Sequence, residues 1–203
     1  ACGTGGFLTA TIDHFEAQVT KKSGAEDRKA IAACIRGMEK KQLPHSLCIT
    51  NMLLHDIDVP SNIKHDNTLA RPYVSYTNAD RVDIILTNPP FGTKGANQAP
   101  DRDDFPVSTR NKQLNFIQHV MTILKPGGRA AVIVPDNVLF ADQAGDVFRV
   151  LTEDCDLHTI LRLPNGTFTP YSPGTKTNVI FFTKGFPTET MWVYDDRTNV
   201  PHI

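Results

Sequence analysis

The stretch TNPPFG at residues 87–92 places an amide side chain, two prolines and an aromatic ring in consecutive positions. These residue types suit chemistry at an amino group on a purine or pyrimidine ring, whose delocalised lone pair is a poor nucleophile. The Asn88 side-chain carbonyl and the rigidly directed Pro89 carbonyl can accept hydrogen bonds from both N–H groups, which favours the pyramidal nitrogen. Phe91 offers a face on which an extruded base could stack. A strand-terminating proline turn with a core phenylalanine would contain the same residues.

A glycine turn opens the sequence in ACGTGGFL, residues 1–8. Gly3 and Gly5 allow backbone amides to approach a ligand, because no side chain projects and positive φ carries little penalty. The dinucleotide fingerprint fails because position 8 is Leu8, and the Gly-Lys-Ser/Thr ending of a phosphate loop is absent. The turn therefore predicts either a backbone cradle for a ligand without a pyrophosphate or a purely structural tight turn.

Two acidic residues follow the next two predicted strands, Glu39 and Asp66. In open α/β sheets, ligands bind beyond the carboxyl ends of the strands. Glu39 is suited to accept hydrogen bonds from two ribose hydroxyls, although a solvated strand-end charge would look the same. The glycine turn, Glu39, Asp66 and the Asn88 turn all fall at such ends, so we expect one site there.

The elements that must position these residues follow from apolar spacing and from turn signals. Helices are predicted over 7–18, from Pro44 onward, over 111–124 and over 142–154, with a further helical stretch from residue 29. Strands are predicted over 35–39, 63–66, 82–87, 129–134, 157–163, 178–183 and 191–194. The 82–87 strand, VDIILT, is apolar enough to be covered on both faces. Residues 19–28 and 94–110 are interpreted as loops.

This alternation predicts an α/β fold with a mostly parallel, doubly wound sheet and an antiparallel edge hairpin. The chain has 203 residues with 40% hydrophobic content, which suits one domain. A formal charge of -1 gives no global attraction to nucleic acid or to a membrane surface. No run of residues is apolar enough for a membrane span, and the four cysteines lack metal-ligand spacing. We expect a cytoplasmic protein without a metal site.

Several motifs together resemble one family. ACGTGGFL, GMEKK, HDNTL and ILTNPPFG, in this order, are similar to amino-group DNA methyltransferases that use S-adenosyl-L-methionine. With LKPGGRAAVIVPDNVLF and LPNGTFTPYSPGTKTNVIFFTKG following, all 203 residues resemble the methyltransferase (M, modification) subunit of type I restriction-modification systems. The resemblance implies a Rossmann-like methyltransferase fold and N6-methylation of adenine in DNA.

The resemblance also implies roles for individual residues. Gly3 and Gly5 would border the methionine part of the cofactor, with Ala1 beside them. Glu39 would hold the ribose, and Asp66 would lie near the adenine amino group of the cofactor. The target base would be received by Asn88, Pro89, Pro90 and Phe91. Methyl transfer would be a direct in-line displacement in which orientation is the main catalytic resource.

In the family, the glycine motif is preceded by Asp-Pro, by the first strand of the sheet, and by a cofactor motif and a helical domain. We therefore interpret residues 1–203 as a partial catalytic domain that starts inside its first motif. On its own, such a chain is expected to bind the cofactor weakly and not to methylate DNA.

The expected partners are DNA and the specificity (S) and restriction (R) subunits, since no sequence-reading element is visible here. The 94–110 loop, with Lys94, Arg102 and Arg110, could order over DNA or be an ordinary surface loop. Two other functions stay open. One is a related methyltransferase acting on a protein glutamine or on RNA, and the other is a noncatalytic scaffold for assembly.

Overall fold

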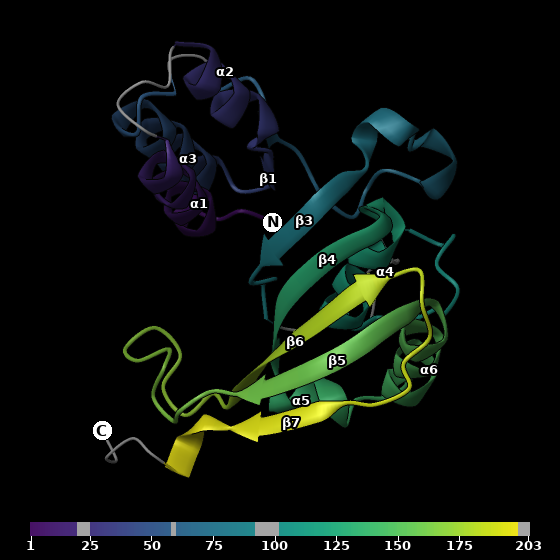
Figure 1. The fold of residues 1–203 in the computed structure, drawn as a ribbon. Coiled ribbons are helices and arrows are strands. Elements are labelled where there is room, and N and C mark those ends of the chain that lie inside the picture. Colours follow the sequence, from purple (N-terminus) through teal and green to yellow (C-terminus); the bar gives the residue numbers. More distant parts are fainter. Residues whose placement is uncertain (20–24, 58–59, 92–101, 199–203) are drawn as a thin grey trace. The chain divides into compact units, whose positions relative to one another are not determined.

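The computed structural model describes residues 1–19, 25–57, 60–91 and 102–198 (Figure 1). The chain forms two compact units, Ala1–Thr68 and Leu69–Ile203. Each unit has a hydrophobic core of its own, so each is described by itself. The expected single domain over residues 1–203 stays a prediction.

The first unit combines helices with a two-stranded parallel sheet. Its elements are α1 (Gly6–Gln18), α2 (Ala25–Cys34), β1 (Gly37–Glu39), α3 (Gln42–Leu54) and β2 (Ile63–His65). Glu39 at the end of β1 pairs with His65 at the end of β2, so the carboxyl ends of both strands lie side by side. Ile12 of α1 and Cys48 and Met52 of α3 are fully buried in the core of this unit. Ile63 of β2 and two residues between elements, Ile35 and Ile57, complete its buried set.

Gly5 determines where α1 begins. It precedes the helix with φ of 92°, a left-handed conformation that side chains rarely adopt. A Cβ at Gly5 would also lie 2.8 Å from the Cys48 Sγ on α3. Both conformation and packing therefore require glycine at this position.

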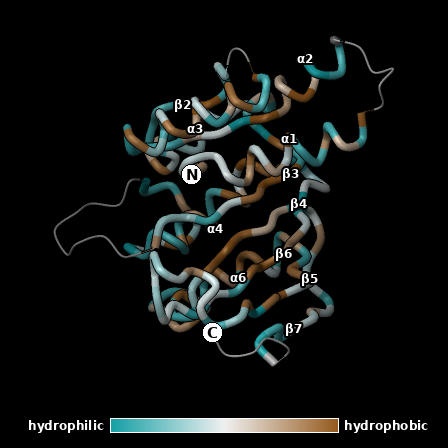
Figure 2. Tube along the Cα trace, turned by 90° about the vertical axis from the view of Figure 1, so that its left-hand side faces the viewer, coloured by the Kyte–Doolittle hydropathy of each residue, from teal (hydrophilic) through white to brown (hydrophobic). Residues whose placement is uncertain are grey.

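The second unit contains a five-stranded sheet in the order β3-β4-β6-β5-β7. Its strands are β3 (Val82–Thr87), β4 (Leu124–Pro135), β5 (Cys155–Arg162), β6 (Thr177–Lys184) and β7 (Trp192–Asp195). Its helices are α4 (Lys112–Ile123), α5 (Asp136–Leu139) and α6 (Ala144–Asp154), with short 3₁₀ turns η1 (Tyr73–Ser75), η2 (Asn78–Asp80) and η3 (Asp196–Thr198). Hydrophobic residues gather along the strands (Figure 2).

Within this sheet, β3 pairs parallel with β4 and β5 pairs parallel with β7, whereas β6 runs antiparallel to both neighbours. All strands of this sheet except β6 therefore run in the same direction, which confirms the predicted α/β class with a mostly parallel sheet. The antiparallel hairpin is also present as β5 and β6, and β6 lies inside the sheet rather than at its edge.

Helix α4 covers one face of this sheet and is buried along most of its length. Leu114, Ile117 and Val120 pack with α6 and with the inward residues of β4 and β6. The Asn111 side chain caps the helix by accepting hydrogen bonds from the amides of residues 113 and 114. The predicted helix at 111–124 is confirmed, and its cap fixes where it starts.

Two sequence predictions about boundaries were wrong. Helix α2 begins at Ala25, inside the stretch predicted as a loop over 19–28. Strand β4 begins at Leu124, five residues before the predicted start at Arg129, because Leu124 already pairs with Val82. The Pro-Gly-Gly sequence that signals the end of a helix forms an irregularity in the β3–β4 pairing, with Gly127 at φ of 76°.

The prediction that the 82–87 strand is covered on both faces was also wrong for the described residues. β3 is an edge strand in which Ile85 packs into the core. Ile84 and Leu86 point to the other face and are 53% and 44% exposed.

Within the described ranges, no helix is both long enough and apolar enough to cross a membrane.

Candidate functional site

Glu39 connects the glycine turn to the end of β1. Its carboxylate accepts hydrogen bonds from the Gly3 amide at 3.0 Å through Oε2 and from the Lys41 amide at 2.9 Å through Oε1. The residue is only 9% exposed. A carboxylate has about four acceptor positions, so each oxygen keeps capacity for one more donor, such as a hydroxyl group. The sequence predicted the acid but not that it also holds the turn.

The backbone at Gly3 is open to a ligand. Gly3 has φ of 57°, and a Cβ built there would meet no atom within 4 Å. The turn is fixed on both sides, because the Cys2 amide donates to the Met38 carbonyl at 2.9 Å and the Gly5 amide donates to the Cys2 carbonyl at 3.0 Å. A rigid, uncovered glycine turn fits the predicted cradle, and Ala1 directly precedes it.

Asp66 lies next to Glu39 because the two strands are paired. The Asp66 amide donates to the Glu39 carbonyl at 3.1 Å, and the exposed Asp66 carboxylate accepts from the Asn67 amide at 2.7 Å. The structure therefore brings Gly3, Glu39 and Asp66 together at one end of the small sheet.

The Asn-Pro-Pro-Phe turn leaves the carboxyl end of β3 in the second unit. A contact that no sequence pattern indicates holds its second proline. Nε2 of Gln113, a buried residue in the first turn of α4, donates to the Pro90 carbonyl at 3.0 Å. Pro89 is buried, and Asn88 is exposed. The turn is thus anchored at Pro90.

Two acceptors in this turn have no hydrogen-bond partner in the part of the chain that the structure describes. There, no hydrogen bond from another residue reaches the Asn88 side-chain carbonyl or the Pro89 carbonyl. These two carbonyls are the acceptors that the sequence assigned to an amino group.

Phe91 forms an aromatic pair with Phe168. The ring centroids are 5.9 Å apart at an interplanar angle of 79°, an edge-to-face arrangement. Phe91 keeps 36% of its surface exposed. Phe168 comes from the 163–176 connection between β5 and β6, which extends from the same side of the sheet as the arrowheads of β3 and β5 (Figure 1). The sequence assigned no role to Phe168.

A second polar cluster lies where β4, β5 and β6 meet this connection. Asp136 follows β4 and accepts hydrogen bonds from Arg162 Nη2 at 2.7 Å and from Asn178 Nδ2 at 2.6 Å. The Asp136 amide donates to the Lys176 carbonyl at 2.9 Å. One carboxylate thus contacts residues on both sides of the connection.

Arg102 is not available as a DNA contact in this structure. Its side chain is 1% exposed, forms an ion pair with Asp104 at 2.6 Å and lies over the Phe105 ring. Arg102 therefore does not face solvent in this structure, and the ordering of the 94–110 loop over DNA stays a prediction. Lys94, in the same predicted loop, lies outside the described residues, and Arg110 is exposed.

His119 of α4 lies beside Arg102 and is also buried. Burial, with the nearby Arg102 charge, lowers the pKa of His119 from 6.5 to about 3. His119 is therefore neutral at physiological pH, and its Nδ1 can accept a hydrogen bond from the Arg102 guanidinium at 3.4 Å.

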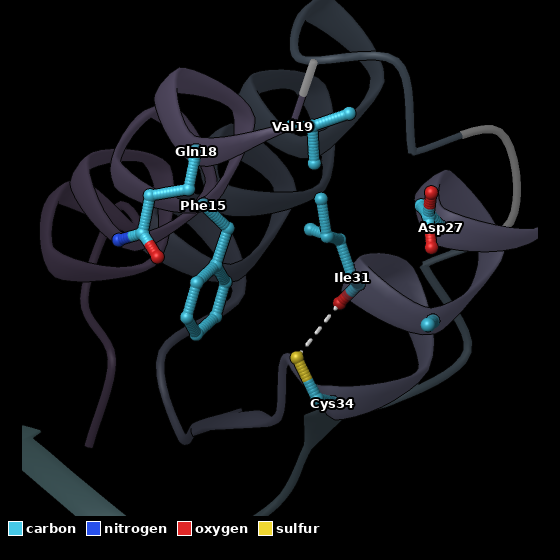
Figure 3. Close-up of a pocket in the computed structure, with 7 residues that line it drawn as sticks. Phe15, Gln18, Val19, Asp27, Ile31 and Cys34 are labelled. Carbon is cyan, nitrogen blue, oxygen red and sulfur yellow. Dashed lines mark hydrogen bonds between the residues drawn. The ribbon is translucent and has the colours of Figure 1, made fainter. Parts of the chain in front are cut away.

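An open hollow of about 520 Å³ lies between the end of α1 and α2 (Figure 3). Phe15 and Ile31 form its apolar sides, and the Cys34 thiol at its edge donates to the Ile31 carbonyl at 3.1 Å. None of the sequence-predicted site residues lines this hollow, so it is not the candidate site.

The two halves of the predicted site therefore lie in different units. The first unit gathers Gly3, Glu39 and Asp66, and the second unit gathers the Asn88–Phe91 turn with Gln113 and Phe168. The prediction that both halves form one site stays a prediction.

A family model described as N-6 DNA Methylase matches residues 1–203. The chain is 49% identical over 198 residues to the methylase subunit of the type I restriction enzyme EcoEI from Escherichia coli, covering 96% of this chain and 39% of that protein. It is 41% identical to the StySPI methylase subunit from Salmonella potsdam, covering 99% of this chain and 40% of that protein. The chain thus spans about two-fifths of the length of these relatives.

Among solved structures, the chain is also similar to a methylase subunit of a type I restriction enzyme. The crystal structure of the M protein of the type I restriction enzyme EcoKI matches with a TM-score of 0.83 and 38% identity, covering all of this chain and 44% of that one. The DNA-bound type ISP restriction-modification enzyme LlaBIII matches with a TM-score of 0.69 at 15% identity, covering 95% of this chain and 17% of that one, which shows similarity of fold alone.

Proposed function

Because the chain belongs to the N-6 DNA methylase family, we propose that it supplies the catalytic site of the modification subunit of a type I restriction-modification system. The proposed reaction transfers a methyl group from S-adenosyl-L-methionine to N6 of adenine in DNA. The observation that carries this proposal is the Asn88 turn. It offers two carbonyl acceptors that no other described residue engages, while Gln113 occupies the neighbouring Pro90 carbonyl.

The first unit would hold the cofactor. Glu39 keeps acceptor capacity for ribose hydroxyls, and the uncovered backbone at Gly3 allows close approach of the methionine part, next to Ala1. Gly5, which is buried against Cys48, completes the turn. Asp66 has an exposed carboxylate suited to accept from an adenine amino group. When bound, the cofactor supplies an electrophilic methyl group on a sulfonium.

The second unit would orient the nucleophile. Asn88 and Pro89 would accept the two N6 hydrogens of an adenine taken out of the duplex, which favours the pyramidal nitrogen with its lone pair free. Pro90, anchored by Gln113, keeps these acceptors in a fixed relation, and Phe91 would stack on the base. Catalysis would then rest on orientation of the two reactants.

The proposed partners follow from the relatives. Their methylase subunits belong to type I restriction enzymes, so DNA, a specificity subunit and a restriction subunit are the partners proposed for the protein that carries this chain. A net charge of -1 supports this division of labour, because it gives the chain little general attraction to DNA.

The test is methyl transfer from tritiated S-adenosyl-L-methionine to DNA by the full-length protein with its specificity subunit. We expect Asn88→Ala to lower the transfer rate by about 100-fold, the scale of losing one aimed hydrogen-bonding group. Asn78→Ala, which changes an exposed asparagine of η2 in the same unit, is the matched control. Equal rates for the two variants would contradict the proposal and favour a noncatalytic scaffold.

A further inference from the structure

The 163–176 connection supplies Phe168, the aromatic partner of Phe91. It forms its own turns, in which the Thr169 amide donates to the Gly166 carbonyl at 2.9 Å and the Ser172 amide donates to the Phe168 carbonyl at 2.8 Å. Tyr171 is 95% exposed. The ends of the connection are joined by the β5–β6 ladder, in which Arg162 pairs with Asn178, and by the Leu163 amide, which donates to the Thr177 carbonyl at 3.0 Å. The local turns do not fix the middle of the segment against the sheet.

Both ends of this connection meet at Asp136. Arg162 is the last residue before the connection, and Asn178 is the second residue after it. The Asp136 carboxylate accepts from Arg162 with one oxygen and from Asn178 with the other, and its amide donates to the Lys176 carbonyl. Asp136 itself directly follows β4, and β4 is the neighbour of β3, the strand that Asn88 follows.

These bonds are of the strong kind. Hydrogen bonds to an ionised carboxylate are shorter and stronger than neutral ones, and both side-chain bonds measure 2.6–2.7 Å. Asn178 is almost fully buried, so its amide would lose its acceptor without Asp136. The side chain of Asp136 also has no catalytic duty in the proposed reaction, so its contacts need another explanation.

We propose that Asp136 is a positioning residue, which holds both ends of the 163–176 connection so that Phe168 braces Phe91 beside the base-binding turn. This inference rests on the proposed function, because the braced ring is the one on which the target adenine would stack. Asp136 acts on the reaction through Phe168 and Phe91 and touches neither reactant.

The test uses the full-length protein with its specificity subunit. Hydrogen exchange of the 163–176 amides, the S-adenosyl-L-methionine Kd, the thermal midpoint, and kcat and KM for DNA are measured for Asp136→Asn and Arg162→Gln. The matched control is Arg149→Gln, which breaks the exposed Arg149–Glu153 ion pair of α6 in the same unit.

We expect Asp136→Asn and Arg162→Gln to speed exchange in the connection by about tenfold, the scale of one lost charge-assisted hydrogen bond. We expect kcat to fall by about tenfold while the cofactor Kd stays unchanged. Arg162→Lys, which keeps the charge, should show smaller changes in amide exchange and in kcat than Arg162→Gln. Arg149→Gln should change neither the exchange of the connection nor kcat.

A double variant tests whether the effect passes through Phe168. If it does, Asp136→Asn adds little to the loss of kcat already caused by Phe168→Ala. Full additivity, or unchanged exchange in the connection, would overturn the inference. An unaltered protein that transfers no methyl group to DNA counts against the proposed function alone, because the exchange measurement still decides whether Asp136 holds the connection.

Discussion

The Gly3 amide donates a hydrogen bond of 3.0 Å to Oε2 of Glu39, which lies 36 residues further along the chain. The other oxygen of the same carboxylate accepts from the Lys41 amide. Glu39 therefore shapes the glycine turn and, in the proposed function, also binds the ribose. Removing the charge of Glu39 should therefore weaken both the hydrogen bond that shapes the turn and the binding of the ribose.

Glu39→Gln is expected to weaken S-adenosyl-L-methionine binding by about tenfold or more, since an amide NH₂ cannot accept from a backbone amide or a hydroxyl. Calorimetric titration of the cofactor into the full-length protein measures this, with Glu16→Gln on the exposed side of α1 as control. Equal affinity in the two variants would remove Glu39 from the cofactor site.

Gly5→Ala is expected to destabilise the first unit by about 1–3 kcal/mol, because alanine is strained at positive φ and its Cβ would approach the Cys48 Sγ. Thermal unfolding measures the loss. Gly6→Ala is the control, since a Cβ there meets no atom within 4 Å in the first turn of a helix. Adding Cys48→Ala should restore only the part of the loss that comes from the close contact.

Gln113→Met keeps the volume of the side chain and removes the donor to the Pro90 carbonyl. We expect the methyl transfer rate to fall by about tenfold with unchanged cofactor affinity, because only the orientation of the base-binding turn is affected. Gln118→Met is the contrasting variant in the same helix. It removes the bonds of Gln118 to the Val107 backbone and should lower stability more than rate.

The pKa of His119, lowered to about 3, predicts how stability depends on pH. An unfolded histidine titrates near 6.5, so between these values the unfolded state binds more protons than the folded state. The contribution is fully present above about pH 6.5 and is lost as the pH falls toward 3, by up to about 1.4 kcal/mol per pH unit.

His119→Gln should therefore flatten the dependence of the unfolding free energy on pH between about 6.5 and 5, above the pKa values of most carboxylates. Denaturant unfolding at several pH values measures this slope. The unaltered protein, measured at the same pH values, is the reference. An unchanged slope in His119→Gln would mean that His119 is protonated in the folded protein.

The sequence predicted the elements that carry the site better than the contacts that hold it. The apolar run before Asn88 and the two prolines after it placed the turn at a strand end, because prolines cannot continue a ladder. The contact of Gln113 with Pro90 joins residues 23 positions apart, and a buried glutamine has no periodic signature. Phe168 comes from a long connection whose path depends on tertiary contacts, so no local pattern assigned it to Phe91.

Arg102 is a residue whose burial the sequence did not predict. A basic residue in a polar stretch suggested a solvated contact to DNA, whereas its guanidinium is desolvated against Phe105 and paired with Asp104. A buried charge can be recognised only when the positions of its partners are known. The partners of Arg102 are Asp104 and Phe105 from its own segment and His119 from α4.

The reversed direction of β6 has a consequence for how this architecture can diversify. A parallel strand would need a crossover to the opposite end of the sheet, usually a helix that must be packed. A hairpin needs only a turn, so the segment between β5 and β6 can change in length and composition while every strand pairing and helix contact is kept. Proteins with this sheet can therefore change the surroundings of the proposed base-binding turn independently of their core, provided that Asp136 still bonds to Arg162 and Asn178 at the two ends of the connection.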